Sequence, residues 1–112
     1  MKSYTDLEQS KKLAEILPIE SADMGYLWHG TSFCEYPVSN QTIFKRTENI
    51  PCWSLAALLN ILDFPALTQE DENEWEVCVQ DYNNDEYIEI KATSPVDACV
   101  EMILKLHELN LL

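Results

Sequence analysis

The stretch from Ile50 to Leu62 constrains the fold most, because only two of its thirteen residues are polar. A helix that is apolar on every side has to be buried on every side. Pro51 suits the first turn of such a helix, since its missing N–H is one of the donors that are left unpaired there. Pro65 disfavours the α region at the residue before it, which ends the helix. The sequence thus predicts a buried helix over about residues 52–63, around which the rest of the chain packs.

The first helix is predicted from its cap. Thr5 and Glu8 have the spacing of a capping box, in which each side chain accepts a hydrogen bond from the backbone N–H of the other residue. Pro18 ends the segment. We therefore expect a helix over about residues 5–17, with apolar side chains toward the core and charged side chains toward water.

The last helix has the clearest start signal in the chain. Ser94 suits the N-cap and Pro95 the first helical position, so a helix is predicted over residues 95–108. Its apolar residues are more numerous than one core requires, and further leucines follow it at the end of the sequence. This surplus predicts a self-association surface and therefore a homodimer. Its members are Met102, Leu104, Leu109, Leu111 and Leu112.

Residues 75–81 and 86–91 alternate between apolar and polar side chains, with turn-tolerant residues between them. This pattern predicts an antiparallel hairpin with one apolar face, formed by Trp75, Val77, Val79, Ile88 and Ile90. Residues 68–74 carry four carboxylates and no apolar side chain, so we expect a solvated loop or a frayed helical turn there. The whole chain, residues 1–112, is predicted to form a single α+β domain. A small antiparallel sheet of three or four strands, built on this hairpin, would pack against the three helices.

The net charge of −13 is concentrated in the second half of the chain. Residues 1–56 hold five Lys/Arg against seven Asp/Glu, whereas residues 57–112 hold two against thirteen. Such a field repels nucleic acid and anionic membranes and attracts a basic partner. We therefore expect neither direct nucleic-acid binding nor membrane association. Two interpretations of the acidic half stay open, a solvated face and a docking surface for a protein.

The sequence also predicts a cytoplasmic location. It has no run of about 18 apolar residues, and its first residues lack an apolar signal region. The four cysteines contain no Cys-x-x-Cys pair, so no metal site and no cofactor is predicted. They are interpreted as buried, reduced thiols: Cys34, Cys52, Cys78 and Cys99.

Six of the eleven aromatic residues lie between Gly25 and Trp53. Short strands are predicted over residues 26–29 and 42–46, with a loop between them. Aromatic rings offer a large contact area at little entropic cost, so this segment is a candidate binding surface. Its candidate binding residues are Tyr26, Trp28, His29, Phe33, Tyr36 and Phe44. The alternative is that the rings only cover the central helix.

Cys52 is the candidate with the sharpest enzymatic chemistry. A helix N-terminus stabilises a thiolate, and Cys52 followed by Trp53 is similar to a dipeptide of papain-like cysteine enzymes. The similarity ends there, because Ile50 and Pro51 replace the glycine-rich approach of those enzymes, and the only downstream histidine, His107, lies in the last predicted helix and not at a strand start. His29 would be the candidate base, although it lies upstream. The alternative is a buried structural thiol.

Two segments, Ile50–Leu59 and Ser94–Leu109, together with Leu7–Glu20, resemble small, functionally uncharacterised proteins encoded on phages and mobile elements of gut anaerobes. The resemblance implies an intracellular accessory protein that acts on a host or element-encoded macromolecule. These proteins have no known activity, so the resemblance assigns no site residues to this chain.

Three classes of function follow from these observations. The first is a non-enzymatic protein-interaction module, of which an acidic protein that imitates nucleic acid would be a variant. The second is a small-ligand-binding protein with an aromatic pocket formed by Tyr26, Trp28, His29 and Trp53. The third is a Cys52-dependent enzyme.

Overall fold

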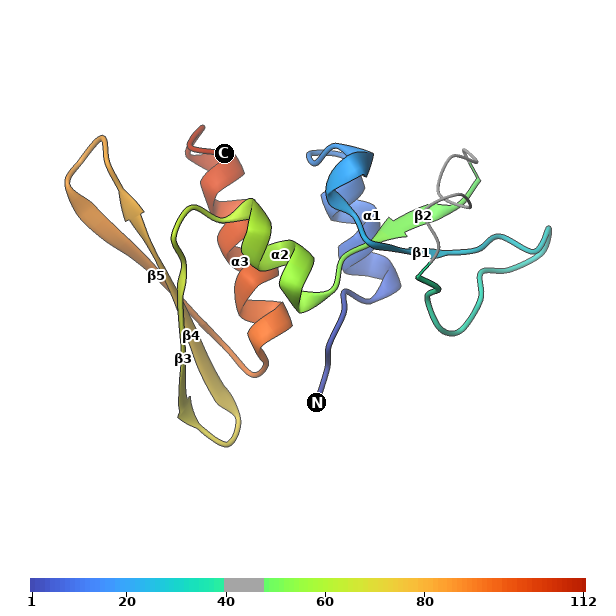
Figure 1. Ribbon diagram of the computed structural model, residues 1–112, viewed down its shortest axis with the longest axis horizontal. Helices are drawn as coiled ribbons and strands as arrows, with labels where there is room; N and C mark the ends of the chain where they lie inside the picture. Colours follow the sequence, from blue (N-terminus) through green and yellow to red (C-terminus); the bar gives the residue numbers. More distant parts are fainter. Residues whose placement is uncertain (40–47) are drawn as a thin grey trace.

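The computed structural model describes residues 1–39 and 48–112, which form an α+β fold (Figure 1). In chain order the elements are α1 (Leu7–Ala14), the 3-10 turn η1 (Ile19–Ser21), β1 (Met24–Tyr26), β2 (Ile50–Cys52), α2 (Leu55–Ile61), β3 (Ala66–Asp71), β4 (Glu74–Asp81), β5 (Glu86–Ala92) and α3 (Pro95–Glu108). The described strands form a two-stranded sheet, β1–β2, and a three-stranded sheet, β3–β4–β5. The helices lie between the two sheets, along a molecule of 47 × 32 × 18 Å.

The predicted hairpin is confirmed in its register. β4 pairs with β5 antiparallel, with Val77 opposite Ile90 and Val79 opposite Ile88. Val77 and Val79 are buried against the helices, as expected for the apolar face. The turn is stabilised by Asp81, whose carboxylate accepts from the backbone N–H of Asn83 at 3.0 Å. Such a side-chain bond to the backbone is typical of Asp in tight turns.

The third strand of this sheet was not predicted. The expectation of a loop or helical turn over residues 68–74 is wrong, because β3 pairs antiparallel with β4 from Ala66 to Asp71. Only Leu67 of β3 is half-buried, and the other side chains are exposed. The strand therefore has no alternating apolar pattern to reveal it. Its pairing with β4 overrides the low β-propensity of its acidic residues.

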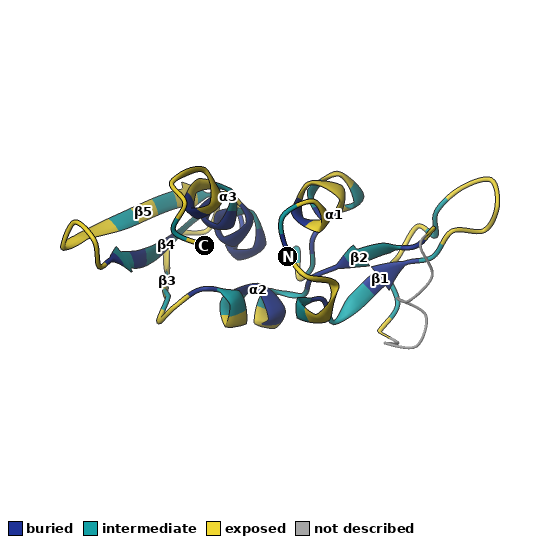
Figure 2. Cartoon of the chain, turned by 90° about the horizontal axis from the view of Figure 1, so that it is seen from above, coloured by how far each residue is buried: buried dark blue, intermediate teal, exposed yellow. Residues whose placement is uncertain are grey.

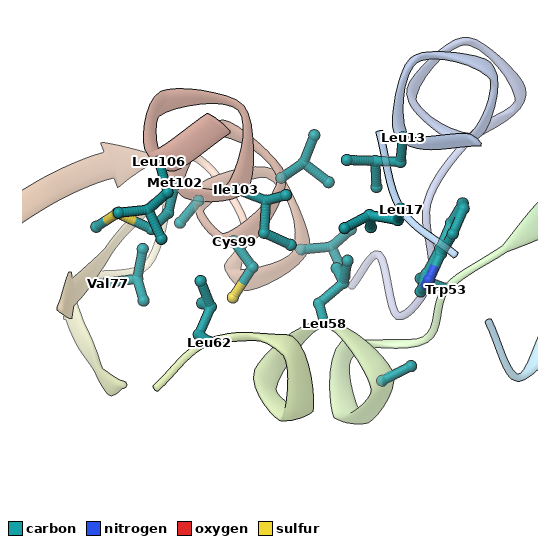
Figure 3. Packing of buried hydrophobic residues seen from close by; sticks show 14 of the residues in the cluster. Leu13, Leu17, Trp53, Leu58, Leu62, Val77, Cys99, Met102, Ile103 and Leu106 are labelled. Atoms are coloured by element: carbon teal, nitrogen blue, oxygen red, sulfur yellow. The ribbon is translucent and has the colours of Figure 1, made fainter. Parts of the chain in front are cut away.

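Helix α3 has the predicted bounds and the predicted cap. The Ser94 hydroxyl accepts from the N–H of Asp97 at 3.1 Å, and Pro95 occupies the first turn. The core is one cluster that extends from α1 through α2 and α3 to β4 (Figure 3). Its fully buried side chains include Leu13, Trp53, Leu58, Val77, Met102 and Ile103. One continuous core is what we expect of a single domain.

The central apolar stretch departs from its prediction at its start. Residues 50–52 form strand β2, and Pro51 pairs with Gly25 of β1 instead of opening a helix. Helix α2 begins only after Ser54, whose hydroxyl accepts from the N–H of Ala57 at 3.2 Å. Proline is tolerated in such a short strand because edge strands do not need every N–H.

Helix α2 is also not buried on every side. Leu58 is fully buried against the core, whereas Ala56 and Asn60 are exposed (Figure 2). Alanine and asparagine are small enough to face water without exposing a large apolar surface. The helix therefore lies at the edge of the core, with α3 on its inner side.

The first helix is shorter than predicted, since it spans Leu7–Ala14 instead of about residues 5–17. Asp6 is the N-cap and forms the capping box with Gln9, whereas Thr5 is fully buried. The Asp6 carboxylate accepts from the Gln9 N–H at 2.8 Å, and the Gln9 side chain accepts from the Asp6 N–H at 3.1 Å. Thr5 instead turns its hydroxyl into the core.

Candidate functional site

Cys52 lies in a closed environment. Its side chain is fully buried, and its thiol donates to the carbonyl oxygen of Thr5 at 3.3 Å. Burial raises the pKa of the Cys52 thiol, and the hydrogen bonds of Thr5 and Ser10 offset only part of this effect. A thiol reacts as its exposed thiolate. The structure thus gives Cys52 the environment of a structural thiol rather than of a nucleophile, and His29 is not among its hydrogen-bond partners.

The Thr5 hydroxyl is the centre of a buried polar cluster around Cys52. It accepts from the backbone N–H of Trp53 at 3.1 Å, shares a hydrogen bond with the Ser10 hydroxyl at 2.7 Å and points toward the Cys52 sulfur at 3.4 Å. The Tyr26 hydroxyl donates to the Thr5 carbonyl at 2.9 Å. Burial raises the pKa of Tyr26, so its phenol stays a donor. This cluster joins the N-terminal segment to strands β1 and β2.

The four residues of the predicted aromatic pocket lie in two different environments. Tyr26 and Trp53 are buried, and the Trp53 indole N–H donates to the Ser21 hydroxyl at 2.9 Å. Trp28 is 38% exposed and His29 is exposed, beyond the end of β1. A small ligand in contact with all four side chains would therefore have to displace part of the core.

Residues 27–34 form a tight hairpin that extends β1. Trp28 and Phe33 face each other across it, with ring centroids 4.9 Å apart in an edge-to-face arrangement. His29 N–H donates to the Ser32 carbonyl at 2.9 Å, and Gly30 supplies the positive φ of 93° that the turn needs. We call residues 27–34 the aromatic hairpin. Tyr36, 66% exposed, follows it, whereas Phe44 and the predicted strand over residues 42–46 lie outside the described residues.

The aromatic hairpin brings together two residues that the sequence did not connect. His29 Nε2 lies 2.8 Å from Cys34 Sγ. The backbone N–H of Cys34 donates to the Leu27 carbonyl at 2.9 Å, which fixes the two strands side by side. Cys34 and Cys78 are only half-buried, so the prediction that all four cysteines are buried is wrong for these two and holds for Cys52 and Cys99. The signal that could have revealed the pair is the glycine after His29, since a turn there that pairs Trp28 with Phe33 places residues 29 and 34 diagonally on one face of the hairpin.

A second candidate site is the face of the β3–β4–β5 sheet that points away from the helices. We call it the acidic sheet face. Lys91 lies within it, 3.4 Å from a carboxylate oxygen of Glu74 and 4.0 Å from one of Glu76. Burial raises the pKa of Glu76, and the nearby carboxylates of Glu89 and Glu70 raise it further. One lysine thus stands among four glutamates whose charges repel one another.

The acidic sheet face is open to solvent. Helices α2 and α3 lie on the opposite side of the sheet (Figure 1). The strand register places on the open side Ala66, Thr68, Glu74, Glu76, Cys78, Gln80, Tyr87, Glu89 and Lys91, and Glu70, at the irregularity of β3, lies beside Glu76. Of these, Tyr87 is 67% exposed. The sheet therefore offers a broad polar surface with one large aromatic side chain.

The C-terminal end of α3 accounts for part of the apolar surplus. Met102 is fully buried in the core, whereas Leu109 and Leu112 are 44% and 47% exposed. Beside them lies a cavity of about 250 Å³, lined in part by Ile61, Val79, Tyr82, Leu106, Leu111 and Leu112. Self-association through this end of the molecule stays a prediction.

Comparisons with known protein families, with curated proteins and with solved structures find no match to this chain. Among the described residues, none of the helices combines the length and apolar character that crossing a bilayer requires. Those same residues contain no cluster of three or more His, Cys, Asp or Glu side chains that could hold a metal ion. The arrangement of the chain's own side chains is therefore the basis for assigning a function.

Proposed function

We propose that this protein is a non-enzymatic interaction module that binds a cationic protein through its acidic sheet face. The observation that carries the proposal is the crowding of Glu70, Glu76 and Glu89 on an open sheet. Burial raises the pKa of Glu76, and the two neighbouring carboxylates raise it further. Ionised carboxylates that repel one another are stabilised when a partner brings positive charge between them. Lys91 supplies one such charge from within the chain. Lysine or arginine side chains of a partner would supply others.

Tyr87 gives this surface an anchor beside its charges. Its ring is two-thirds exposed and lies opposite Gln80 on the same face as Glu89 and Lys91. Tyrosine is enriched among the residues that contribute most to protein–protein binding, because it combines a large apolar area with a polar tip. A partner could therefore bury the Tyr87 ring while its cations approach the glutamates.

The charge distribution also favours a protein over nucleic acid as the partner. The acidic sheet lies in the half of the chain that holds thirteen Asp/Glu against two Lys/Arg, and phosphate backbones are repelled by such a field. The resemblance to phage and mobile-element proteins would place the partner among host or element-encoded proteins, in the cytoplasm. A basic, nucleic-acid-binding protein is one whose charge would match.

The proposal is tested by neutralising the surface without changing its shape. We would immobilise the wild type and the variant Glu70→Gln/Glu76→Gln/Glu89→Gln, capture proteins from lysate of the source cells, and measure the affinity of the captured protein at low and moderate salt. The expected result is one cationic partner whose affinity falls about tenfold or more in the variant and falls with salt in the wild type.

The matched control is Glu15→Gln/Glu101→Gln/Glu108→Gln, which changes the net charge equally at exposed helix positions. It should keep the affinity within about twofold, because screened charges at a distance contribute little. Equal losses in both triple variants would show a nonspecific charge effect and would contradict the proposal. Unchanged binding in the sheet variant would contradict it as well.

A further inference from the structure

We propose that Cys34 and His29 form a reactive thiol–imidazole pair, and that its reactant is a low-molecular-weight disulfide of the glutathione class. The pair does not depend on the acidic sheet face, which lies at the other end of the molecule (Figure 1). The product is a mixed disulfide at Cys34, a reversible modification of the aromatic hairpin.

The geometry is that of a nucleophile with its base. His29 Nε2 lies 2.8 Å from Cys34 Sγ, within reach for a direct proton transfer. The backbone holds both residues in place, because the Cys34 N–H donates to Leu27 and the His29 N–H donates to Ser32. Trp28 and Phe33, which pair directly between the two strands, add an edge-to-face ring contact to the hairpin. The hairpin register therefore places His29 and Cys34 diagonally on one face, where the imidazole reaches the thiol.

The other cysteines explain why the reactant has to come from outside the chain. All four cysteines lie in the described residues and all are free. Cys52 and Cys99 are buried, and burial raises the pKa of Cys99 to about 11. Cys78 is on the acidic sheet face, where burial and then Glu89 and Glu76 raise its pKa. No second thiol is positioned to resolve a disulfide at Cys34, so an external disulfide forms a product that persists until an external thiol removes it.

The partial exposure of the pair leaves it accessible to a small reactant. Cys34 is half-buried and His29 is exposed, with the Trp28 ring beside them 38% exposed. The Lys11 ammonium lies 5.8 Å from the centroid of the Phe33 ring, which places a positive charge beside the hairpin of an otherwise acidic protein. A small disulfide that carries carboxylates could approach that ammonium. Acyl transfer would need preorganised donors for a tetrahedral oxyanion, whereas disulfide exchange needs only a thiolate and access.

The step balances without an oxidant other than the disulfide itself. His29 Nε2 accepts the Cys34 proton, and the thiolate attacks one sulfur of the disulfide. A bond forms between Cys34 Sγ and that sulfur while the original S–S bond breaks. The second sulfur leaves as a thiolate and takes the proton from the His29 imidazolium. Cys34 is oxidised and the leaving half of the disulfide is reduced.

The test uses oxidised glutathione as the probe on the full, folded chain at neutral pH. Intact mass spectrometry measures the rate of adduct formation, and peptide mapping finds the modified cysteine. We expect one glutathionyl group per chain, on Cys34, with Cys52 and Cys99 unmodified. Cys34→Ser should abolish the adduct, whereas Cys78→Ser should leave the rate unchanged. Modification of Cys78 at a rate equal to that of Cys34 would overturn the proposal.

The contribution of the base is tested with His29→Gln, which keeps a polar side chain at an exposed position. We expect the rate at neutral pH to fall about tenfold or more. His107→Gln is the matched control, because it removes the other, also exposed, histidine, and its rate should equal that of the wild type. Thermal unfolding verifies that the variants stay folded.

An unchanged rate in His29→Gln would overturn the role of the imidazole. Alkylation of Cys34 by iodoacetamide serves as a second probe of the same thiol. If alkylation depends on His29 but oxidised glutathione gives no adduct, the assignment of a small disulfide as reactant is wrong.

Discussion

Replacing Thr5 by valine tests how much the buried polar cluster stabilises the fold. Valine has nearly the shape of threonine, so the substitution removes the hydroxyl and leaves no large cavity. The hydroxyl is the acceptor for the Trp53 backbone N–H at 3.1 Å and the partner of the Ser10 hydroxyl at 2.7 Å, and both Thr5 and Ser10 are fully buried. A buried polar group left without its partner costs about 1–3 kcal/mol.

Two groups lose a partner in Thr5→Val, so the expected loss is about 2–6 kcal/mol in the free energy of unfolding. The Ser10 hydroxyl can turn toward Cys52, which makes the lower half of this range the expected one. For a domain of this size each kcal/mol corresponds to about 4–8 °C, so the melting temperature should fall by roughly 10–30 °C. Urea unfolding followed by tryptophan fluorescence measures the free energy, since Trp53 is fully buried.

Two further variants separate the hydrogen bonds from general effects of the substitution. Thr31→Val changes the same chemical group at an exposed position and should stay within about 0.5 kcal/mol of the wild type. Thr5→Val/Ser10→Ala removes both hydroxyls and should be less destabilised than the sum of the single variants, because they share one bond. A loss below about 0.5 kcal/mol in Thr5→Val would refute the reasoning that this hydroxyl is required by its buried partners.

Four other predictions concern positions elsewhere in the fold. Ser94→Ala should cost about 1 kcal/mol in urea unfolding, because the cap of α3 is lost. Burial raises the pKa of Asp97, but hydrogen bonds from Lys2, at 2.8 Å, and from Gln9 and Ser94 lower it on balance. The stability that the ionised Asp97 carboxylate contributes is therefore present above about pH 4 and is lost as the pH falls through the lowered pKa. The difference in unfolding free energy between wild type and Asp97→Asn should therefore shrink between pH 7 and pH 3. Phe64 is 86% exposed at a φ of 47°, so Phe64→Asn should raise the free energy of unfolding by about 0.5–1 kcal/mol. If α3 mediates a homodimer, light scattering should show a dimer that Leu109→Ser/Leu112→Ser converts to monomer; a monomeric wild type at high concentration would contradict it.

The parts of the fold that could be predicted are those in which local signals agree with tertiary packing. In α3 the cap, the proline and the apolar stripe all indicate the same element, and the structure has the predicted bounds. In the β4–β5 hairpin, alternation fixes the register, since a slip of one residue would expose Val77 and Val79. Each of these elements has one buried side, which is what makes its pattern readable.

The parts that could not be predicted have patterns set by distant residues. Strand β3 is exposed and acidic, and only pairing with β4 makes it a strand. Strand β2 is three residues long, and its sequence predicts the start of a helix because its apolar residues continue directly into α2. At the candidate sites, the sequence identifies individual residues as candidates but does not predict which other residues they contact. The sequence offers His29 as a base for Cys52, whereas the hairpin turn places it beside Cys34.

The helices that separate the two sheets also separate the two proposed sites. The acidic sheet face and the aromatic hairpin lie at opposite ends of a molecule 47 Å long (Figure 1). A macromolecule docked at one end leaves the other end uncovered, so both sites can be occupied at the same time. The chain is thus elongated, with a different binding surface at each end, and it could hold two different molecules at once without either displacing the other.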